Sequence, residues 1–166
     1  MFYVKMIYMK KLNIGKYIDF DEFSNYVQEL IISINGNIQE LNDSEKVLFV
    51  RDNLDKSILN SKIFVGQLSD EIKEILNSNT KELYFSIDNM IKNRLVHSEV
   101  TNEDYKKIPK IIKNPSKYYK SKNGYDVILF KEDEKFYKLV IKTTKNKKEN
   151  FVKSLHLLNY ERYKKY

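Results

Sequence analysis

The chain has 166 residues, 42% of them hydrophobic, so it can bury a core of its own as one domain with an N-terminal extension. It contains no cysteine, which excludes disulfides, thiolate metal sites and cysteine nucleophiles. The net charge of +7 comes from residues 100–166, with 18 Lys+Arg against 8 Asp+Glu, whereas residues 1–60 have 7 against 9 and residues 61–99 have 5 against 6. A basic C-terminal half is typical of a module that handles a polyanion.

The sequence also bears on membrane segments, on metal sites and on the acidic cluster of the basic half. No run of about 18 apolar residues is present, so we expect no membrane span or signal peptide and a cytoplasmic protein. His97 and His156 lack HxxxH or HExxH spacing, which argues against a histidine metal site. The acidic cluster at 132–134 is typical of a solvated hairpin tip. We therefore expect no metal and no cofactor.

Residues 1–60 predict an α-helical hairpin that forms an accessory segment. Asp19 is an N-cap candidate for an apolar stripe of helical period that ends before Gly36. A second helix is predicted from Ser44, as its N-cap, to about residue 59. This mildly acidic segment could form a homodimer through residues 17–60, hold an immunity or antitoxin partner, or mask the basic half.

The next elements alternate short strands with helices. A strand is predicted at 63–66, a helix at 69–76 and a second strand at 82–85. From Ser86 the helical period returns, and this helix carries His97 at its C-terminal end.

The remainder predicts helices followed by a meander. Thr101 opens a helix with a capping-box pattern, Pro109 splits it, and Asn114-Pro115 ends it. The hydrophobic period then changes to two, and three strands joined by short charged turns are predicted at 125–130, 136–142 and 151–157. We therefore expect residues 61–166 to form a basic α+β domain, with N-terminal helices packed on a C-terminal antiparallel β-meander.

Two histidines are candidates for acid–base chemistry. Imidazole suits proton transfer near neutral pH, and a helix C-terminus stabilises the imidazolium form of His97 as a general acid. Strand alternation predicts that Val152, Ser154 and His156 share one face and that Lys153 lies on the other. A hydroxyl and an imidazole on one face can bind a phosphate. The alternatives are an ordinary capping histidine and a half-exposed polar pair.

Lysines and tyrosines of the basic half are candidates for nucleic-acid binding. Lys138 and Lys142 share a strand face if no bulge intervenes, and a lysine fixed there can neutralise charge on a reacting phosphate. Aromatic rings stack on unpaired bases while lysines contact the phosphates. The alternatives are a compositional bias for tyrosine and a solvated lysine loop. The predicted nucleic-acid-binding residues are Tyr118, Tyr119, Lys120, Tyr137, Lys145, Lys147, Lys148 and Lys153.

The order of these elements over residues 62–160 resembles a known nuclease family. A helix ending in His97, a segment ending in Asn114-Pro115, a basic residue on a strand, and Ser154 on the last long strand are similar to the pattern of the barnase/EndoU/colicin/RelE-like (BECR) nuclease domains of phage and mobile-element proteins. The resemblance implies an antiparallel sheet packed on N-terminal helices, and either a metal-independent ribonuclease or an inactive relative.

The resemblance also implies a mechanism. A base takes the proton of a ribose 2′-hydroxyl, the oxygen attacks the adjacent phosphorus, and an acid protonates the leaving 5′-oxygen, which leaves a 2′,3′-cyclic phosphate. In this chain His97 would be the acid or base, His156 its partner, Lys138 or Lys142 would balance the phosphate charge, and Ser154 would donate a hydrogen bond to the phosphate. The expected substrate is single-stranded RNA or tRNA.

A catalytically inactive protein is the alternative prediction. Such a protein would use the basic face to bind nucleic acid or a host ribonucleoprotein, as a phage counter-defence inhibitor would. The two predictions differ in their dependence on His97, which the enzyme requires and the binder does not.

Overall fold

The structure is a computed structural model that describes residues 40–54, 56–122 and 125–166, with residues 21, 22, 25, 28, 29, 31 and 32. These last seven residues are helical, in agreement with the helix predicted after Asp19. The rest of that helix, and the predicted turn at Gly36, lie outside the described residues.

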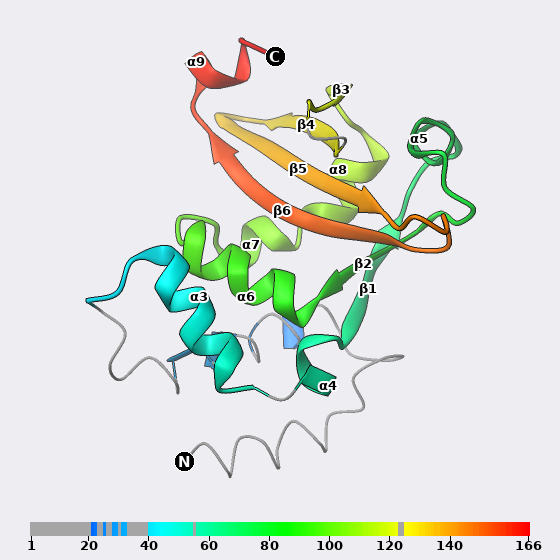
Figure 1. The fold of residues 1–166 in the computed structure, drawn as a ribbon. Helices are drawn as coiled ribbons and strands as arrows, with labels where there is room; N and C mark the ends of the chain where they lie inside the picture. The colour runs from blue at the N-terminus through cyan, green and yellow to red at the C-terminus, as the bar shows by residue number, and fades with distance from the viewer. Residues whose placement is uncertain are drawn as a thin grey trace.

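The second helix of the predicted hairpin is two helices, α3 (Asp43–Asp52) and α4 (Lys56–Leu59). Its N-cap is Asn42, not Ser44 as predicted: the Asn42 side chain accepts from the Glu45 amide at 2.9 Å, and the Glu45 carboxylate accepts from the Asn42 amide at 3.3 Å. This reciprocal capping box satisfies two backbone donors that a helix start otherwise leaves unpaired. Figure 1 shows α3 beside a later helix, α6 (Ile87–Val96), against which it packs.

Six strands form one sheet in the order β1-β2-β6-β5-β4-β3. All neighbouring pairs are antiparallel except β2 and β6, which run parallel. The predicted meander is confirmed as β4-β5-β6, and the two earlier predicted strands join the same sheet as β1 and β2, whereas β3 was not predicted. The fold is therefore α+β. The strands are β1 (Lys62–Gln67), β2 (Glu82–Ser86), β3 (Lys117–Lys120), β4 (Asp126–Glu132), β5 (Lys135–Thr143) and β6 (Asn150–Leu158).

Side-chain caps begin three of the remaining helices where the sequence predicts them. Ser69, Ser86 and Thr101 each accept a hydrogen bond from the backbone amide three residues later, at 3.1, 3.1 and 3.3 Å. Pro109 lies in the first turn of the helix α8 (Ile108–Lys113), and Asn114 is the C-cap of this helix. These helices are α5 (Asp70–Leu76), α6, α7 (Asn102–Tyr105), α8 (Ile108–Lys113) and, at the end of β6, α9 (Tyr160–Tyr163). In the described part of the chain, none is long and apolar enough to cross a membrane.

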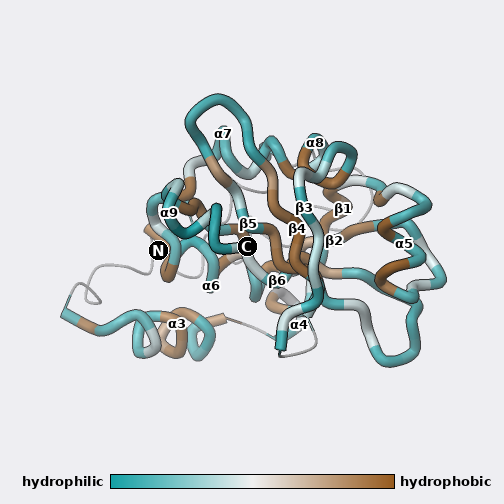
Figure 2. The backbone as a smooth tube through the Cα atoms, turned by 90° about the horizontal axis from the view of Figure 1, so that it is seen from above, coloured by the Kyte–Doolittle hydropathy of each residue, from teal (hydrophilic) through white to brown (hydrophobic). Residues whose placement is uncertain are grey.

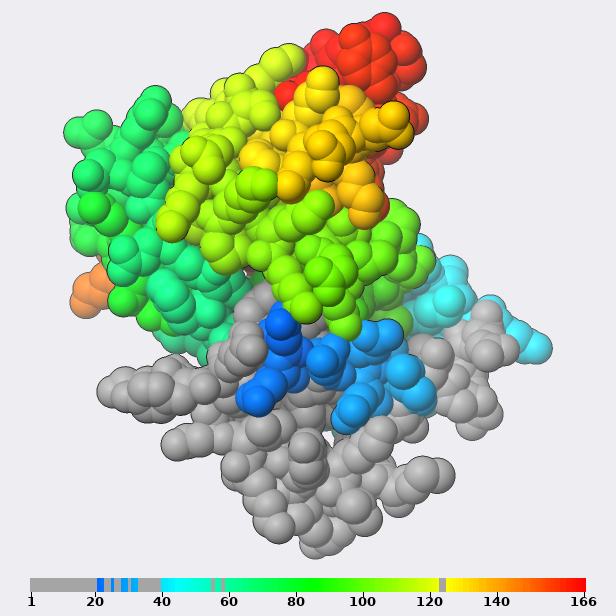
Figure 3. Space-filling view, turned by 180° about the vertical axis from the view of Figure 1, so that it is seen from behind, coloured from blue at the N-terminus to red at the C-terminus, as the bar shows by residue number. Residues whose placement is uncertain are grey.

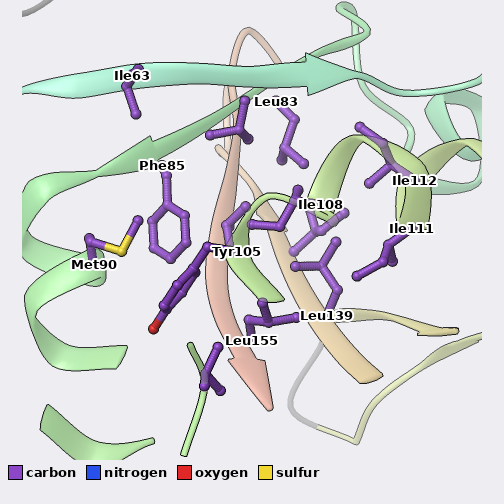
Figure 4. Close-up of a cluster of buried hydrophobic side chains, with 14 of the residues drawn as sticks. Ile63, Leu83, Phe85, Met90, Tyr105, Ile108, Ile111, Ile112, Leu139 and Leu155 are labelled. Atoms are coloured by element: carbon purple, nitrogen blue, oxygen red, sulfur yellow. The ribbon is translucent and has the colours of Figure 1, made fainter. Parts of the chain in front are cut away.

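The main core lies between one face of the sheet and the helices α6, α7 and α8. Apolar stretches gather along the central strands (Figure 2), and their side chains meet those of the helices in one cluster (Figure 4). Tyr105, Ile108, Leu139 and Leu155 in this cluster are fully buried. Burial of this apolar surface is the main force that holds helices and sheet together.

A buried carboxylate ties the helices to the sheet within this core. Asp104 accepts hydrogen bonds from the Thr101 amide at 2.8 Å, the Tyr137 hydroxyl at 2.7 Å and the Lys135 ammonium at 2.9 Å. Burial alone would raise the pKa of Asp104, but these donors hold the pKa at about 2. The charged form is therefore retained inside the protein, as expected of a buried acid that has partners.

The opposite face of the sheet has a smaller cluster that includes Phe136, Val140 and Leu158. The C-terminal turn covers one end of it, because the Tyr163 ring lies 4.6 Å from that of Phe136. Seen from behind, the last residues adjoin the β4–β5 hairpin (Figure 3). The part of this face that continues towards Val140 carries the polar residues described next.

Candidate active site

Two asparagines of α6 hydrogen-bond to backbone groups of β6 on the edge where its pairing with β2 has ended. β6 pairs with β2 at Asn150 and Phe151, and beyond that point α6 lies along the strand. Asn89 donates to the Val152 carbonyl at 3.1 Å. Asn93, which is 2% exposed, donates to the Leu155 carbonyl at 3.1 Å and accepts from the Leu155 amide at 2.9 Å. The Asn93 amide thus takes the place of a neighbouring strand.

The same helical stripe places His97 against His156. Residues 89, 93 and 97 are each four apart and so lie on one helix face. His97 is the C-cap of α6, and its amide donates to the Asn93 carbonyl at 2.8 Å. Its ring centroid lies 3.8 Å from that of His156, with the planes inclined by 43°. The two predicted histidines, 59 positions apart in the sequence, are in direct contact.

A cavity of about 360 Å³ opens beside the histidine pair. Its lining brings together four of the five predicted catalytic residues and adds further lysines, which give it a basic character. The charged and polar residues of the lining include His97, His156, Ser154, Lys138, Lys153 and Lys92.

A β-bulge in β6 corrects the predicted alternation. Val140 pairs with Ser154, but the next residue of β5, Ile141, pairs with Val152, so Lys153 is an extra residue. Val152 is fully buried in the main core instead of sharing the face of Ser154. Lys153 lines the cavity with Ser154 and His156, although simple alternation placed it on the other side.

Lys138 and Lys142 occupy different sites. Lys138 pairs directly with His156 across the sheet and lines the histidine cavity, and its ammonium donates to the Tyr166 hydroxyl at 3.2 Å. Lys142 pairs with Phe151 and lines a different cavity. The lysine beside the histidines is therefore Lys138.

Both histidines favour the neutral form in the free protein. Burial, together with the charges of His97 and Lys138, lowers the pKa of His156 to about 4. Burial also lowers the pKa of His97, although Glu99, whose carboxylate lies 3.6 Å from Nδ1, acts in the opposite direction. Nε2 of His156 is hydrogen-bonded to the Ser154 hydroxyl at 2.8 Å. At this ring separation, repulsion disfavours two imidazolium ions, so the pair holds at most one extra proton near neutral pH.

The predicted nucleic-acid-binding residues fall on different parts of the fold. The prediction for Tyr137 is wrong, because its side chain is fully buried on the helix-covered face and donates to Asp104. Tyr118 packs against the main core and donates to Asp126, and Tyr119 stacks on Tyr166 at 5.1 Å. Lys153 lines the histidine cavity, and Lys148 lines neither that cavity nor the one beside Lys142. The remaining three, Lys120, Lys145 and Lys147, line the same cavity as Lys142.

Asn89 and Asn93 were missed by sequence reasoning. Their signal was their spacing: each lies a multiple of four residues before His97, so the helix presents all three on one side. What the spacing could not reveal is that a strand edge with unpaired backbone groups lies opposite them.

Comparisons of the chain with family models, curated proteins and solved structures gave no match. Among the described residues, no group of three or more His, Asp or Glu side chains stands together as a metal ion would require.

Proposed function

We propose that this protein is a metal-independent endoribonuclease of the BECR type. The observation that carries the proposal is the contact of His97 with His156 in a cavity lined by Lys138, Lys153 and Ser154. Two imidazoles supply a general base and a general acid, and lysines beside them favour a phosphate ligand. The helices that precede the meander and Ser154 on its last strand agree with the family pattern.

The environments of the two rings favour distinct roles. His156 is buried and faces Lys138, which keeps it neutral and able to accept the 2′-hydroxyl proton. His97 lies at a helix C-terminus with Glu99 near Nδ1, and both features favour its imidazolium form as the acid.

In the reaction, the O2′–P bond forms as His156 takes the proton, and the P–O5′ bond breaks as His97 protonates the leaving oxygen. A bound phosphate would supply the negative charge that stabilises the imidazolium. Lys138 and the Ser154 hydroxyl would stabilise charge that develops on the phosphorane oxygens.

The test is cleavage of a mixed single-stranded RNA and of tRNA in EDTA by the parent protein, His97→Ala and His156→Ala. Lys113→Ala, at an exposed position of α8 away from the cavity, is the matched control. We expect discrete products with 2′,3′-cyclic phosphate ends from the parent and Lys113→Ala, and loss of at least 100-fold in rate for each histidine variant. A substrate with 2′-deoxyribose at the cleaved position must stay intact, and its cleavage would refute 2′-hydroxyl attack.

An inactive RNA-binding protein is the second candidate. It is favoured by burial, which lowers the pKa of both histidines, so that the free protein holds less imidazolium to act as acid. Tight RNA binding that Lys138→Glu removes and His97→Ala preserves, with no cleavage by any form, would support this candidate over the enzyme.

A further inference from the structure

A second basic cavity, also of about 360 Å³, lies further along the same strands. Its lining includes four lysines that come from β3, β5 and the loop after β5: Lys120, Lys142, Lys145 and Lys147. Asp126 is the one carboxylate among the described residues of this lining. It is 4% exposed, accepts from the Tyr118 hydroxyl, and lies 3.9 Å from the Lys120 ammonium. The cavity therefore has a strong positive character, which suits an anion.

Tyr125 joins this cavity to the histidine cavity, because its side chain lines both. Two lysines flank its ring: the Lys142 ammonium lies 5.9 Å from the ring centroid and the Lys153 ammonium 6.0 Å. Lys153 belongs to the first cavity and Lys142 to the second. The order along the face is thus lysine, aromatic ring, lysine.

The loop that carries Lys145 and Lys147 is anchored to the neighbouring part of the fold. The Lys147 carbonyl accepts from the Asn79 amide at 2.8 Å and from the Ser78 hydroxyl at 3.4 Å. The Thr144 amide donates to the Glu149 carbonyl at 2.9 Å, which closes the base of the loop. A loop tied down in this way presents its lysines at a defined place beside Lys142, so less conformational entropy is lost when they bind.

We propose that the second cavity binds a neighbouring phosphate of the same RNA strand, and that Tyr125 stacks on the base between the two phosphates. This inference rests on the proposed ribonuclease function and specifies its substrate as single-stranded RNA that spans both cavities. The alternation of aromatic and basic side chains matches the alternation of bases and phosphates along a strand. A base that stacks on Tyr125 must be unpaired, so duplex RNA is excluded from this path.

The experiment measures binding with 2′-O-methyl oligonucleotides, which lack the attacking hydroxyl, so affinity is obtained without cleavage. A labelled hexanucleotide and a labelled dinucleotide of mixed sequence are titrated in EDTA by fluorescence anisotropy. The proteins are the parent, Tyr125→Ala, Tyr125→Phe and the double variant Lys142→Ala/Lys145→Ala. Tyr160→Ala and Lys113→Ala, at exposed positions outside both cavities, are the matched controls.

For the hexanucleotide, Tyr125→Ala should weaken binding by about 5- to 150-fold, the fold-change that corresponds to the loss of one stacked base, and Tyr125→Phe should retain parent affinity. The double lysine variant should lower the slope of log K against log salt by roughly 0.7, since the second cavity holds one phosphate and each phosphate contact on a single strand contributes about 0.7. The dinucleotide has one phosphate and cannot span both cavities, so the double lysine variant should bind it with parent affinity, and the controls should match the parent.

Equal loss of hexanucleotide and dinucleotide affinity in the double lysine variant would overturn the proposal, as would parent-like hexanucleotide binding by Tyr125→Ala. If this pattern fails while His97-dependent cleavage persists, the ribonuclease stands and the second subsite is wrong. If the pattern holds and no RNA is cleaved, the two-cavity path stands as that of a binding protein. Thermal unfolding of Tyr125→Phe and Tyr125→Ala is measured alongside, to check that both variants remain folded.

Discussion

Replacement of Asn93 by leucine is expected to destabilise the protein and to disturb the histidine pair. The side chain of Asn93 is the partner of both the amide and the carbonyl of Leu155, a residue that is fully buried. Leucine has nearly the shape of asparagine but can neither donate nor accept, so both groups would be buried without a partner.

The size of the effect follows from those two groups. Each buried backbone group that loses its partner costs about 1–3 kcal/mol, so the free energy of unfolding should fall by roughly 3 kcal/mol. For a chain of this size, this corresponds to a decrease of about 6–12 °C in Tm. The loss should appear as a lower urea midpoint with an unchanged m-value, because the surface exposed on unfolding is nearly the same.

Asn89→Ala is the matched control. Asn89 has the same side-chain chemistry one turn earlier but makes one hydrogen bond to the strand, to the Val152 carbonyl. It should cost about 1 kcal/mol. An Asn93→Leu variant no less stable than Asn89→Ala would refute the reasoning that Asn93 substitutes for a strand at this edge.

Three further predictions concern stability. Gly66→Ala should cost about 1–3 kcal/mol, because the added Cβ would lie 2.8 Å from Cδ1 of the buried Ile112; Ile112→Val, which removes that atom, should recover part of the loss in a double-mutant cycle. Asp104→Asn should lower the urea midpoint by the equivalent of roughly 3 kcal/mol, because an amide cannot accept from the Thr101 amide and the other donors together; an unchanged midpoint would contradict this role. The folded-state pKa of His156, about 4, lies below its ordinary value of 6.5. Its contribution to the free energy of unfolding, at most roughly 3 kcal/mol, is therefore complete above pH 6.5 and is lost as the pH falls from 6.5 to 4. Urea unfolding of His156→Gln should show a smaller decrease in the free energy of unfolding over that pH range than the parent shows.

Helix starts and the meander could be predicted because their signals are local. Ser69, Ser86 and Thr101 cap helices through bonds to residues three positions away, so the sequence contains the whole interaction. The pairing of β4, β5 and β6 needs only short turns. The parallel contact of β2 with β6 joins segments more than 60 residues apart, and no local pattern indicates it.

The sequence pattern failed mainly to show which face of each strand is covered by helices. Along β5 both alternating sets contain apolar residues, so the pattern could not show that Tyr137 points into the core and Lys138 towards the histidines. The bulge at Lys153 separates Val152 from the face of Ser154 and His156, and its presence depends on the register with Ile141.

The histidines themselves could be selected from their chemistry alone. Their contact could not, because it depends on the edge of β6 that Asn93 covers.

The position of β6 in the sheet has a consequence for synthesis on the ribosome. β6 follows the other five strands in the sequence, yet it lies between β2 and β5, and it carries Ser154 and His156. While the chain is being translated, β1 and β2 can form a hairpin and β3, β4 and β5 a second sheet fragment, but no histidine pair exists until the last strand emerges and joins them. Under the ribonuclease function proposed above, we therefore expect a nascent chain that still lacks β6 to leave RNA intact, including the messenger that encodes it.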